Sequence, residues 1–302
     1  MGEKSDEDIE NLIREGLNVE NSELDLREKE LEDNDLKRIV KSDSVKGVTA
    51  VFLEFNQIGD EGIKALLDSE NMKFVTALNL FKNKVTDEGV KAISKSKTLL
   101  NLSELILSDN EVTAKGAQFL AESKTLGSLV SLWVGDDIGD EGVKSLATSD
   151  RLTRLNLLSL YRNNISDEGM RAIAGSQTLS TLTELNMNWN YVEGAGIEAL
   201  AESKTLTKLE QLTLTYNPIG DRGAIAIANS EALKNLKVLD LFETEISDEG
   251  ARALAESSTL TELETLILIR NDIGAEVQEL FKKPKHLKKL TNIMFRQINP
   301  DA

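Results

Sequence analysis

The chain has 302 residues, 40% of them hydrophobic, and a formal net charge of −17 at pH 7. This length and apolar content allow a sizeable buried core. Because the chain contains no cysteine and one histidine, disulfides and thiolate zinc sites are excluded and little imidazole chemistry is available. The negative charge disfavours binding to nucleic acid and to anionic membranes and favours basic partners.

The first residues, MGEKSDEDIENL, are too charged for the apolar segment of a secretion signal, and no run of 18 apolar residues follows. We therefore expect a cytoplasmic protein. Ser5 is placed to cap a helix whose apolar residues share one face: Ile9, Leu12, Ile13 and Leu17. The sequence thus predicts an N-terminal helical cap over residues 1–23. Residues 3 to 35 are strongly acidic.

A pattern of the form L-x-L-x-x-N-x-I recurs almost without interruption along the rest of the chain. Successive copies are 27 residues apart, except for a step of 26 residues between Leu132 and Leu158. The first apolar residues of the copies are Leu24, Val51, Leu78, Leu105, Leu132, Leu158, Leu185, Leu212, Leu239, Leu266 and Ile293. The spacing predicts ten repeats over residues 24–292 and a C-terminal capping strand and tail over 293–302.

Each repeat is predicted to contain one strand and one helix. In the copy that begins at Leu78, Leu78 and Leu80 alternate as on a strand with one buried face. Thr86 then supplies a helix cap, and Val90 and Ile93 have helical spacing. Because one repeat cannot bury both its strand and its helix alone, neighbouring repeats must stack.

The repeat, with D-E-G-x-x-A-L/I-A after the strand pattern, resembles the ribonuclease-inhibitor type of leucine-rich repeat and the GALA-type repeats of bacterial effector proteins. The resemblance covers residues 24 to 298. It implies an α/β solenoid shaped like a horseshoe, with parallel strands on the concave face, one helix per repeat on the convex face, and a binding role. It also favours a bacterial origin, so an effector secreted without a cleavable signal is the alternative location.

One asparagine follows the strand in most repeats. We expect its side chain to bond backbone groups left unpaired where the chain turns, a structural role. The column contains Asn56, Asn83, Asn110, Asn163, Asn190, Asn217 and Asn271. It is interrupted at Lys29, Asp137 and Thr244, and Asp137 lies in the shortened repeat, where a local distortion is expected.

Aromatic residues gather at the positions expected to point away from the core. Each copy of the pattern has three such positions, one between its two leucines and two after the second leucine, and each position forms a column along the chain. Eight of the thirteen aromatic residues fall in these three columns, and two arginines accompany them. The predicted partner-binding residues are Phe52, Phe55, Phe81, Trp133, Tyr161, Arg162, Trp189, Tyr216, Phe242 and Arg270. Aromatic anchors within a polar rim are typical of interaction hot spots. The alternative is that rings on adjacent strands pack on one another and stiffen the sheet.

The strand spacing predicts a ridge through Trp133, Tyr161, Trp189, Tyr216 and Phe242, on five successive strands. The leading hypothesis is therefore a non-catalytic module that binds a protein or peptide, with a basic partner favoured and with no role for nucleic acid or membrane. The second hypothesis is self-assembly into homo-oligomers, because the acidic N-terminal cap contrasts with a basic C-terminal edge. That edge contains Lys282, Lys283, Lys285, Lys288, Lys289 and Arg296.

Catalysis, metals and cofactors find little support in the sequence. It has no glycine-rich phosphate loop and no serine next to a base, so we expect no catalytic residue and no cofactor. The D-E-G triplets lack the ligand spacing of a calcium loop, and capping of the helix that each one begins explains them, so no metal site is predicted. The GTPase-activating protein of the GTPase Ran has the same repeat type, which leaves activation of a GTPase as a third hypothesis, without a role for any named residue.

Overall fold

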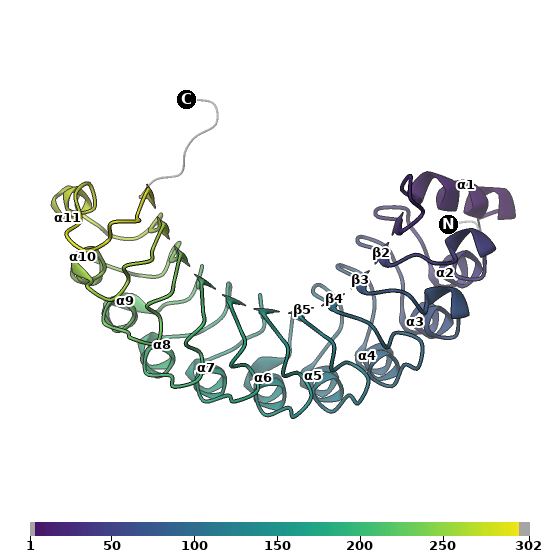
Figure 1. Cartoon of the computed structure of the whole chain (residues 1–302), viewed down its shortest axis with the longest axis horizontal. Helices are drawn as coiled ribbons and strands as arrows, with labels where there is room; N and C mark the ends of the chain where they lie inside the picture. The colour runs from purple at the N-terminus through teal and green to yellow at the C-terminus, as the bar shows by residue number, and fades with distance from the viewer. Residues whose placement is uncertain (1–3, 296–302) are drawn as a thin grey trace. The chain divides into compact units, whose positions relative to one another are not determined.

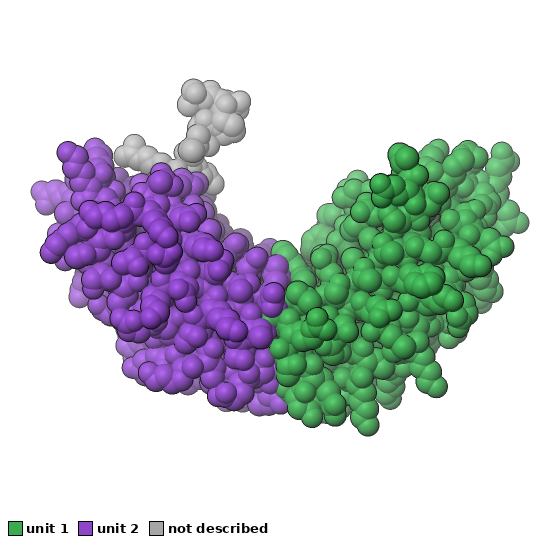
Figure 2. Space-filling view, viewed as in Figure 1, with its two compact units in different colours: residues 1–138, 149–155 green, residues 139–148, 156–302 purple. Residues whose placement is uncertain are grey.

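The computed structural model describes residues 4–295, which alternate between short strands and helices (Figure 1). Contacts between Cα atoms divide the chain into two compact units (Figure 2). Unit 1 takes the residues up to 138 together with 149–155, and unit 2 takes 139–148 and the residues from 156 onward. The division falls in the shortened repeat, where the sequence predicts a distortion. Residues 296–302, including Arg296 and most of the predicted tail, lie outside the described part.

In unit 1, each strand pairs in parallel with the next strand along the chain. The elements of the unit are α1 (Asp6–Gly16), β1 (Glu23–Asp25), α2 (Asp33–Ile39), η1 (Asp43–Val45), β2 (Ala50–Phe52), α3 (Asp60–Leu67), η2 (Glu70–Met72), β3 (Ala77–Asn79), α4 (Asp87–Ser94), β4 (Glu104–Ile106), α5 (Ala114–Ala121) and β5 (Ser131–Trp133).

Unit 2 continues the same alternation, again with parallel pairing between consecutive strands. Its elements are α6 (Gly139–Ala147), β6 (Leu157–Ser159), α7 (Asp167–Ala174), β7 (Glu184–Asn186), α8 (Gly194–Ala201), β8 (Gln211–Thr213), α9 (Gly220–Ala228), β9 (Val238–Asp240), α10 (Asp248–Glu256), β10 (Thr265–Ile267), α11 (Ala275–Leu280) and β11 (Asn292–Met294).

The core of each unit lies between its strands and its helices. In the repeat that begins at Leu78, the side chains of Leu78 and Leu80 from the strand side and of Val90 and Ile93 from α4 are all buried. Thr86 caps α4 by accepting a hydrogen bond from the N–H of Glu88. The predicted fold class, a leucine-rich-repeat solenoid of parallel strands with a helix in each repeat, is confirmed within each unit.

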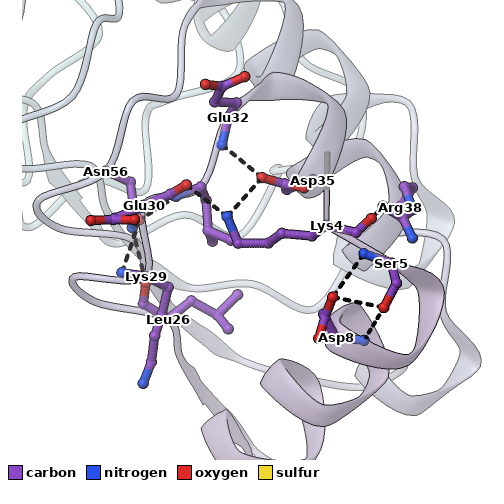
Figure 3. Close-up of polar contacts among 11 residues, drawn as sticks. Lys4, Ser5, Asp8, Leu26, Lys29, Glu30, Glu32, Asp35, Arg38 and Asn56 are labelled. Carbon is purple, nitrogen blue, oxygen red and sulfur yellow. Dashed lines mark hydrogen bonds and ion pairs between the residues drawn. The ribbon is translucent and has the colours of Figure 1, made fainter. Parts of the chain in front are cut away.

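The N-terminal helix packs on the first repeat and is fastened to it by polar contacts (Figure 3). Ser5 and Asp8 form a capping box at the start of α1, and Ile9 and Ile13 are buried beneath the helix. Lys4 Nζ donates to the carbonyl oxygen of Glu30 at 2.8 Å and to Asp35 Oδ2 at 3.3 Å. The buried face of α1 therefore covers the end of the repeat core, and the polar contacts hold the helix in place.

Asparagine side chains link the backbone of successive repeats. Asn190 Nδ2 donates to the carbonyl oxygen of Leu160 in the preceding repeat and to that of Met187 in its own repeat, both at 2.8 Å. Asn190 Oδ1 accepts from the N–H of Ile165 at 3.0 Å. The same bridging is made by Asn56, Asn83, Asn110, Asn217 and Asn271. One amide therefore satisfies backbone groups of two repeats, and we call this series the asparagine ladder.

The aspartate of the D-E-G triplet forms a second link between repeats, at the start of the helices. Asp140 Oδ1 accepts from the N–H groups of Ser166 and Gly169 in the next repeat, both at 2.9 Å. Asp140 Oδ2 accepts from Ser166 Oγ at 2.6 Å. The carboxylate of the triplet therefore caps the start of the helix in the following repeat. A Cβ atom at Gly169 would lie 2.5 Å from Asp140 Oδ1, so the glycine makes room for the aspartate.

A third link joins the ends of the helices, through buried serines. Ser203 Oγ donates to the carbonyl oxygen of Ala174, 29 residues earlier, at 2.6 Å. Five further serines donate in the same way to a carbonyl oxygen 28 or 29 positions earlier: Ser123, Ser149, Ser176, Ser230 and Ser257. Within each unit, a carbonyl oxygen at the end of a helix is therefore bonded by a serine of the next repeat.

Replacing Asn190 by alanine should lower the free energy of unfolding by about 3 kcal/mol, because buried backbone groups in two repeats lose their partner. Urea denaturation of the intact chain measures the change. The control is Asn34→Ala, an exposed position on α2, which should change the stability by less than about 0.5 kcal/mol. Equal stability of the two variants would refute the importance of the ladder.

Replacing Gly169 by alanine should cost about 2 kcal/mol, because the added methyl group overlaps Asp140. Gly127→Ala is the matched control, since the nearest atom to its added Cβ is the carbonyl oxygen of Arg151 at 3.7 Å. Thermal unfolding should distinguish the two variants. If both glycines tolerate alanine equally well, the aspartate does not need the space.

Candidate functional site

The strands of each unit present one row of side chains to the core and another to the outside. In β7 the middle residue, Leu185, is buried, whereas Glu184 and Asn186 are partly exposed. Met187 is buried again, and Asn188 points outward from the core. We call the outward side the strand face; it corresponds to the surface predicted as concave.

The residue just before each ladder asparagine reaches the strand face through an unusual backbone conformation. At Phe55, Trp189 and Tyr216, φ is between 57° and 58°, in the left-handed region that bulky residues rarely adopt. The conformation is held by a backbone bond to the next repeat: the N–H of Trp189 donates to the carbonyl oxygen of Thr215 at 2.8 Å. Strand alternation alone does not predict this geometry, which directs large rings outward.

In unit 2, three of the predicted residues form an aromatic cluster, which we define as Trp189, Tyr216 and Phe242. The ring centroids of Trp189 and Tyr216 are 3.8 Å apart, and those of Tyr216 and Phe242 are 5.4 Å apart. Trp189 keeps 47% of its surface exposed. The cluster therefore combines ring packing, as the alternative hypothesis requires, with an accessible indole.

Charged side chains border the aromatic cluster. The Arg270 guanidinium carbon lies 5.5 Å from the centre of the Phe242 ring, and Arg270 Nη1 donates to Glu243 Oε2 at 2.9 Å. The Arg162 guanidinium carbon lies 5.9 Å from the centre of the Tyr161 ring. Arg162 and Arg270 are exposed, whereas Tyr161 is partly buried. Arg270 and Glu243 thus give the cluster a charged edge, whereas Arg162 contacts Tyr161, which is not a member of the cluster.

The remaining predicted residues belong to unit 1. Phe55 and Phe81 meet edge to face, with ring centroids 5.2 Å apart, and Phe55 is 43% exposed. Phe52 lies under the Arg27 guanidinium, 5.9 Å from its carbon. Trp133 is partly exposed in β5, and its Nε1 donates to Ser131 Oγ at 3.2 Å. The predicted ridge is therefore divided, with Trp133 in unit 1 and its other four members in unit 2.

Sequence analysis missed Tyr191, an aromatic residue that is 64% exposed. It follows the ladder residue Asn190 and is two positions after Trp189, outside the three columns. A search extended by two positions beyond the third column would have found it. Tyr191 enlarges the exposed aromatic surface of this repeat.

Two acidic side chains on the strand face are shielded from solvent: Glu54 is buried, and Asp240 is partly buried. Burial raises the pKa of Glu54, and the opposing effects of its own backbone N–H and of Arg27 do not cancel it. Burial also raises the pKa of Asp240, although hydrogen bonds from the Phe242 backbone and the Thr215 side chain oppose the shift. Both carboxylates are less stable in the charged form than they are in water.

Residues 4–295 contain neither a metal-binding group of side chains nor a membrane-spanning helix. No group of three or more histidine, aspartate and glutamate side chains there is arranged to hold a metal ion. Within the same residues, no helix is long and apolar enough to cross a membrane. A hollow of about 640 Å³ on the helix side of unit 2 is lined by α8 and α9, with Arg222 and Glu198 joined as an ion pair at its wall.

The stability of the chain should depend on the protonation of Glu54. Because its folded-state pKa lies above the ordinary value of 4.5, the folded state binds the proton more tightly than the unfolded state does. The free energy of unfolding of the natural chain, relative to Glu54→Gln, should therefore fall as the pH rises from 4.5 through the folded-state pKa. Urea denaturation of both chains across this range measures it, and a constant difference would contradict the assignment.

Comparison with known proteins gives one family match and two structural likenesses. A leucine-rich repeat family model matches residues 48–67, 71–94, 98–121, 152–174, 178–201, 205–228 and 232–255, which together make up more than half of the chain. No curated protein matches the sequence. The chain is similar to an internalin (inlF) of Listeria monocytogenes, with 17% identity and a TM-score of 0.36, over 98% of this chain and 90% of the other.

A second likeness is to the functional domain of InlJ from Listeria monocytogenes, with 14% identity and a TM-score of 0.48, over 91% of this chain and 53% of the other. At these values neither likeness carries an argument about function. The family match rests instead on repeats that lie in both units and contain the helices described above. The chain belongs to the leucine-rich repeat family.

Proposed function

We propose that this protein is a non-catalytic recognition module that binds a protein or peptide on its strand face, with Trp189, Tyr216 and Phe242 as anchors. Membership of the leucine-rich repeat family supports the general role, because such domains typically bind protein partners. One helix in each repeat favours the ribonuclease-inhibitor-like or GALA-like subtype. The location, in the cytoplasm or as a secreted bacterial effector, is part of the same proposal.

The observation that carries the proposal is the exposed indole of Trp189 on a strained backbone. The left-handed backbone belongs to the repeat, since Arg162 and Arg270 adopt it too. A bulky side chain there costs roughly 1 to 2 kcal/mol, and the ladder bonds made by Asn190 do not require one. The indole contacts the Tyr216 ring on one side and keeps nearly half of its surface exposed. Tryptophan and tyrosine with a nearby arginine are the residues enriched in hot spots.

Self-assembly through the chain ends has weaker support. The backbone of Leu17 forms an antiparallel bridge with Leu24 in β1, and α1 packs on the same strand, so the N-terminal strand is already covered. At the other end, Phe281 and Phe295 are in ring contact beside β11.

Contacts between oppositely charged ends would weaken with salt, whereas binding at an aromatic anchor would change little. Activation of a GTPase stays a third candidate without a residue to carry it.

The test compares the intact chain with a Trp189→Ala/Tyr216→Ala variant. We expect the variant to lose capture of a partner from cell lysate, and its affinity for the purified partner to fall about 30-fold or more. Its stability should change by no more than about 2 kcal/mol, as measured by urea denaturation.

Phe74→Ala is the control, because Phe74 is an aromatic residue that is 50% exposed and precedes β3 in unit 1, whereas the aromatic cluster belongs to unit 2. It should retain the partner. Equal binding by all three chains would refute the proposed anchors, and unfolding of the double variant would show that the rings serve the sheet.

A further inference from the structure

Glu54 on the strand face of unit 1 is a buried acid with an unsatisfied oxygen. The residue is 8% exposed, and its Oε1 accepts from Asn79 Nδ2 at 2.7 Å. Its Oε2 is buried and has no hydrogen-bond partner among the residues that the structure describes. A buried acceptor without a donor is unfavourable, and more so when it carries charge. The fold itself gives no reason for an acid at this position, since the neighbouring repeats carry Arg27 and Phe81 there.

The side chains around Glu54 offer aromatic surfaces that attract positive charge. Phe52 precedes it by two residues and is paired in register with Asn79, and Phe55 follows it and packs against Phe81. Lys82 Nζ lies 5.1 Å from the centre of the Phe55 ring. Cations over ring faces are stabilised by the quadrupole of the ring. The chain's own side chains therefore show that this surface accommodates a cation.

The chain's own arginine beside this surface, Arg27, is bonded to another carboxylate. Arg27 lies over the Phe52 ring, but its Nε donates to Asp25 Oδ1 at 2.9 Å and its Nη2 donates to Asp25 Oδ2 at 2.5 Å. A guanidinium held at two points by one carboxylate has its planar donors aligned with that carboxylate. Arg27 therefore acts on the Glu54 charge only at a distance, and the buried Oε2 of Glu54 has no donor among the residues that the structure describes.

We propose that Glu54, Phe52 and Phe55 form a subsite for one arginine or lysine side chain of a protein partner. The inference rests on the proposed recognition function and adds the chemistry of the group recognised. The incoming side chain takes the place of the exposed Lys82 over the Phe55 ring and packs its stem beside Phe52, and its cationic head donates to the unsatisfied oxygen of Glu54. Because that oxygen is buried, binding includes a rotation of the Glu54 side chain toward the surface, while Oε1 can keep its bond to Asn79.

A positive charge is the feature that distinguishes this ligand from others. A neutral hydroxyl or amide would satisfy the oxygen but would leave the carboxylate charge uncompensated on a chain with a formal charge of −17. An anionic group would be repelled by Glu54 and by the same net charge. The partner segment is therefore basic at the point where it meets β2 and β3.

The test is a titration of the intact chain, with its phenylalanine rings labelled with carbon-13, followed by nuclear magnetic resonance. The probes are N-acetyl-arginine amide and N-acetyl-lysine amide, and N-acetyl-citrulline amide is the neutral analogue of similar shape. We expect saturable shifts of the Phe52 and Phe55 rings with both cationic probes, with a Kd on the order of 10 mM. Phe52→Leu and Phe55→Leu variants assign the two signals.

Glu54→Gln should weaken binding of the cationic probes about tenfold, because it removes the charge and keeps the shape. Asp240→Asn is the matched control: it also replaces an acid on the strand face whose pKa is raised, but this acid is partly buried, lies in unit 2 and has donors to its oxygen, so binding should not change. If Glu54→Gln does not fold, as judged by circular dichroism, Phe55→Leu takes its place and should weaken binding about threefold.

Equal shifts with the citrulline probe, no saturable shift with the arginine probe, or unchanged affinity in the Glu54→Gln chain would each overturn the subsite. These outcomes are separate from those of the partner capture experiment. If the chain binds arginine amide here but captures its partner without Trp189 and Tyr216, the subsite is supported and the proposed anchors are refuted. If capture depends on Trp189 and Tyr216 but arginine amide does not bind here, the anchors are supported and the subsite is refuted.

Discussion

The structure depends on side chains that bond the backbone of a neighbouring repeat. A three-residue strand and a short helix leave many backbone groups unpaired at each turn, and an isolated repeat has no means of satisfying them. Asn190 bonds the backbone on both sides of one junction, Asp140 does so at the helix starts, and Ser203 at the helix ends. Stacking is therefore directional and specific, beyond the burial of leucine side chains.

This division of labour leaves the strand face free to vary. The buried leucines and the ladder asparagines stabilise the fold, while the outward side chains between them contribute little to the core. Trp189 is the clearest case: its N–H serves the sheet, but its indole lies outside the core. In unit 1 the same positions hold Phe55 beside the buried acid Glu54, so the two units offer different surfaces on the same framework.

The periodic spacing was enough to predict the fold class, the strand and helix of each repeat, and the positions of the outward residues. It did not predict contacts that depend on the neighbouring repeat. The aspartate of D-E-G was interpreted as a local helix cap, but Asp140 bonds the next helix, because the offset between repeats brings the two together. The left-handed backbone at Trp189 was not predicted, since glycine is the residue that normally marks it. Its marker in this chain is the position just before a ladder asparagine, which Phe55 and Tyr216 share.

Burial of Glu54 was likewise invisible in the sequence, where it is one of many acidic residues; it depends on the side chains that β2 and β3 bring together. The central claim is that the ladder and the outward rings have separate roles. It is tested most directly by amide hydrogen exchange at Ile165 and Val192, whose N–H groups donate to Asn190 and Asn217, in the intact chain and in the Trp189→Ala/Tyr216→Ala variant. The account predicts the same slow exchange in both chains, and faster exchange of these amides in the variant would contradict it.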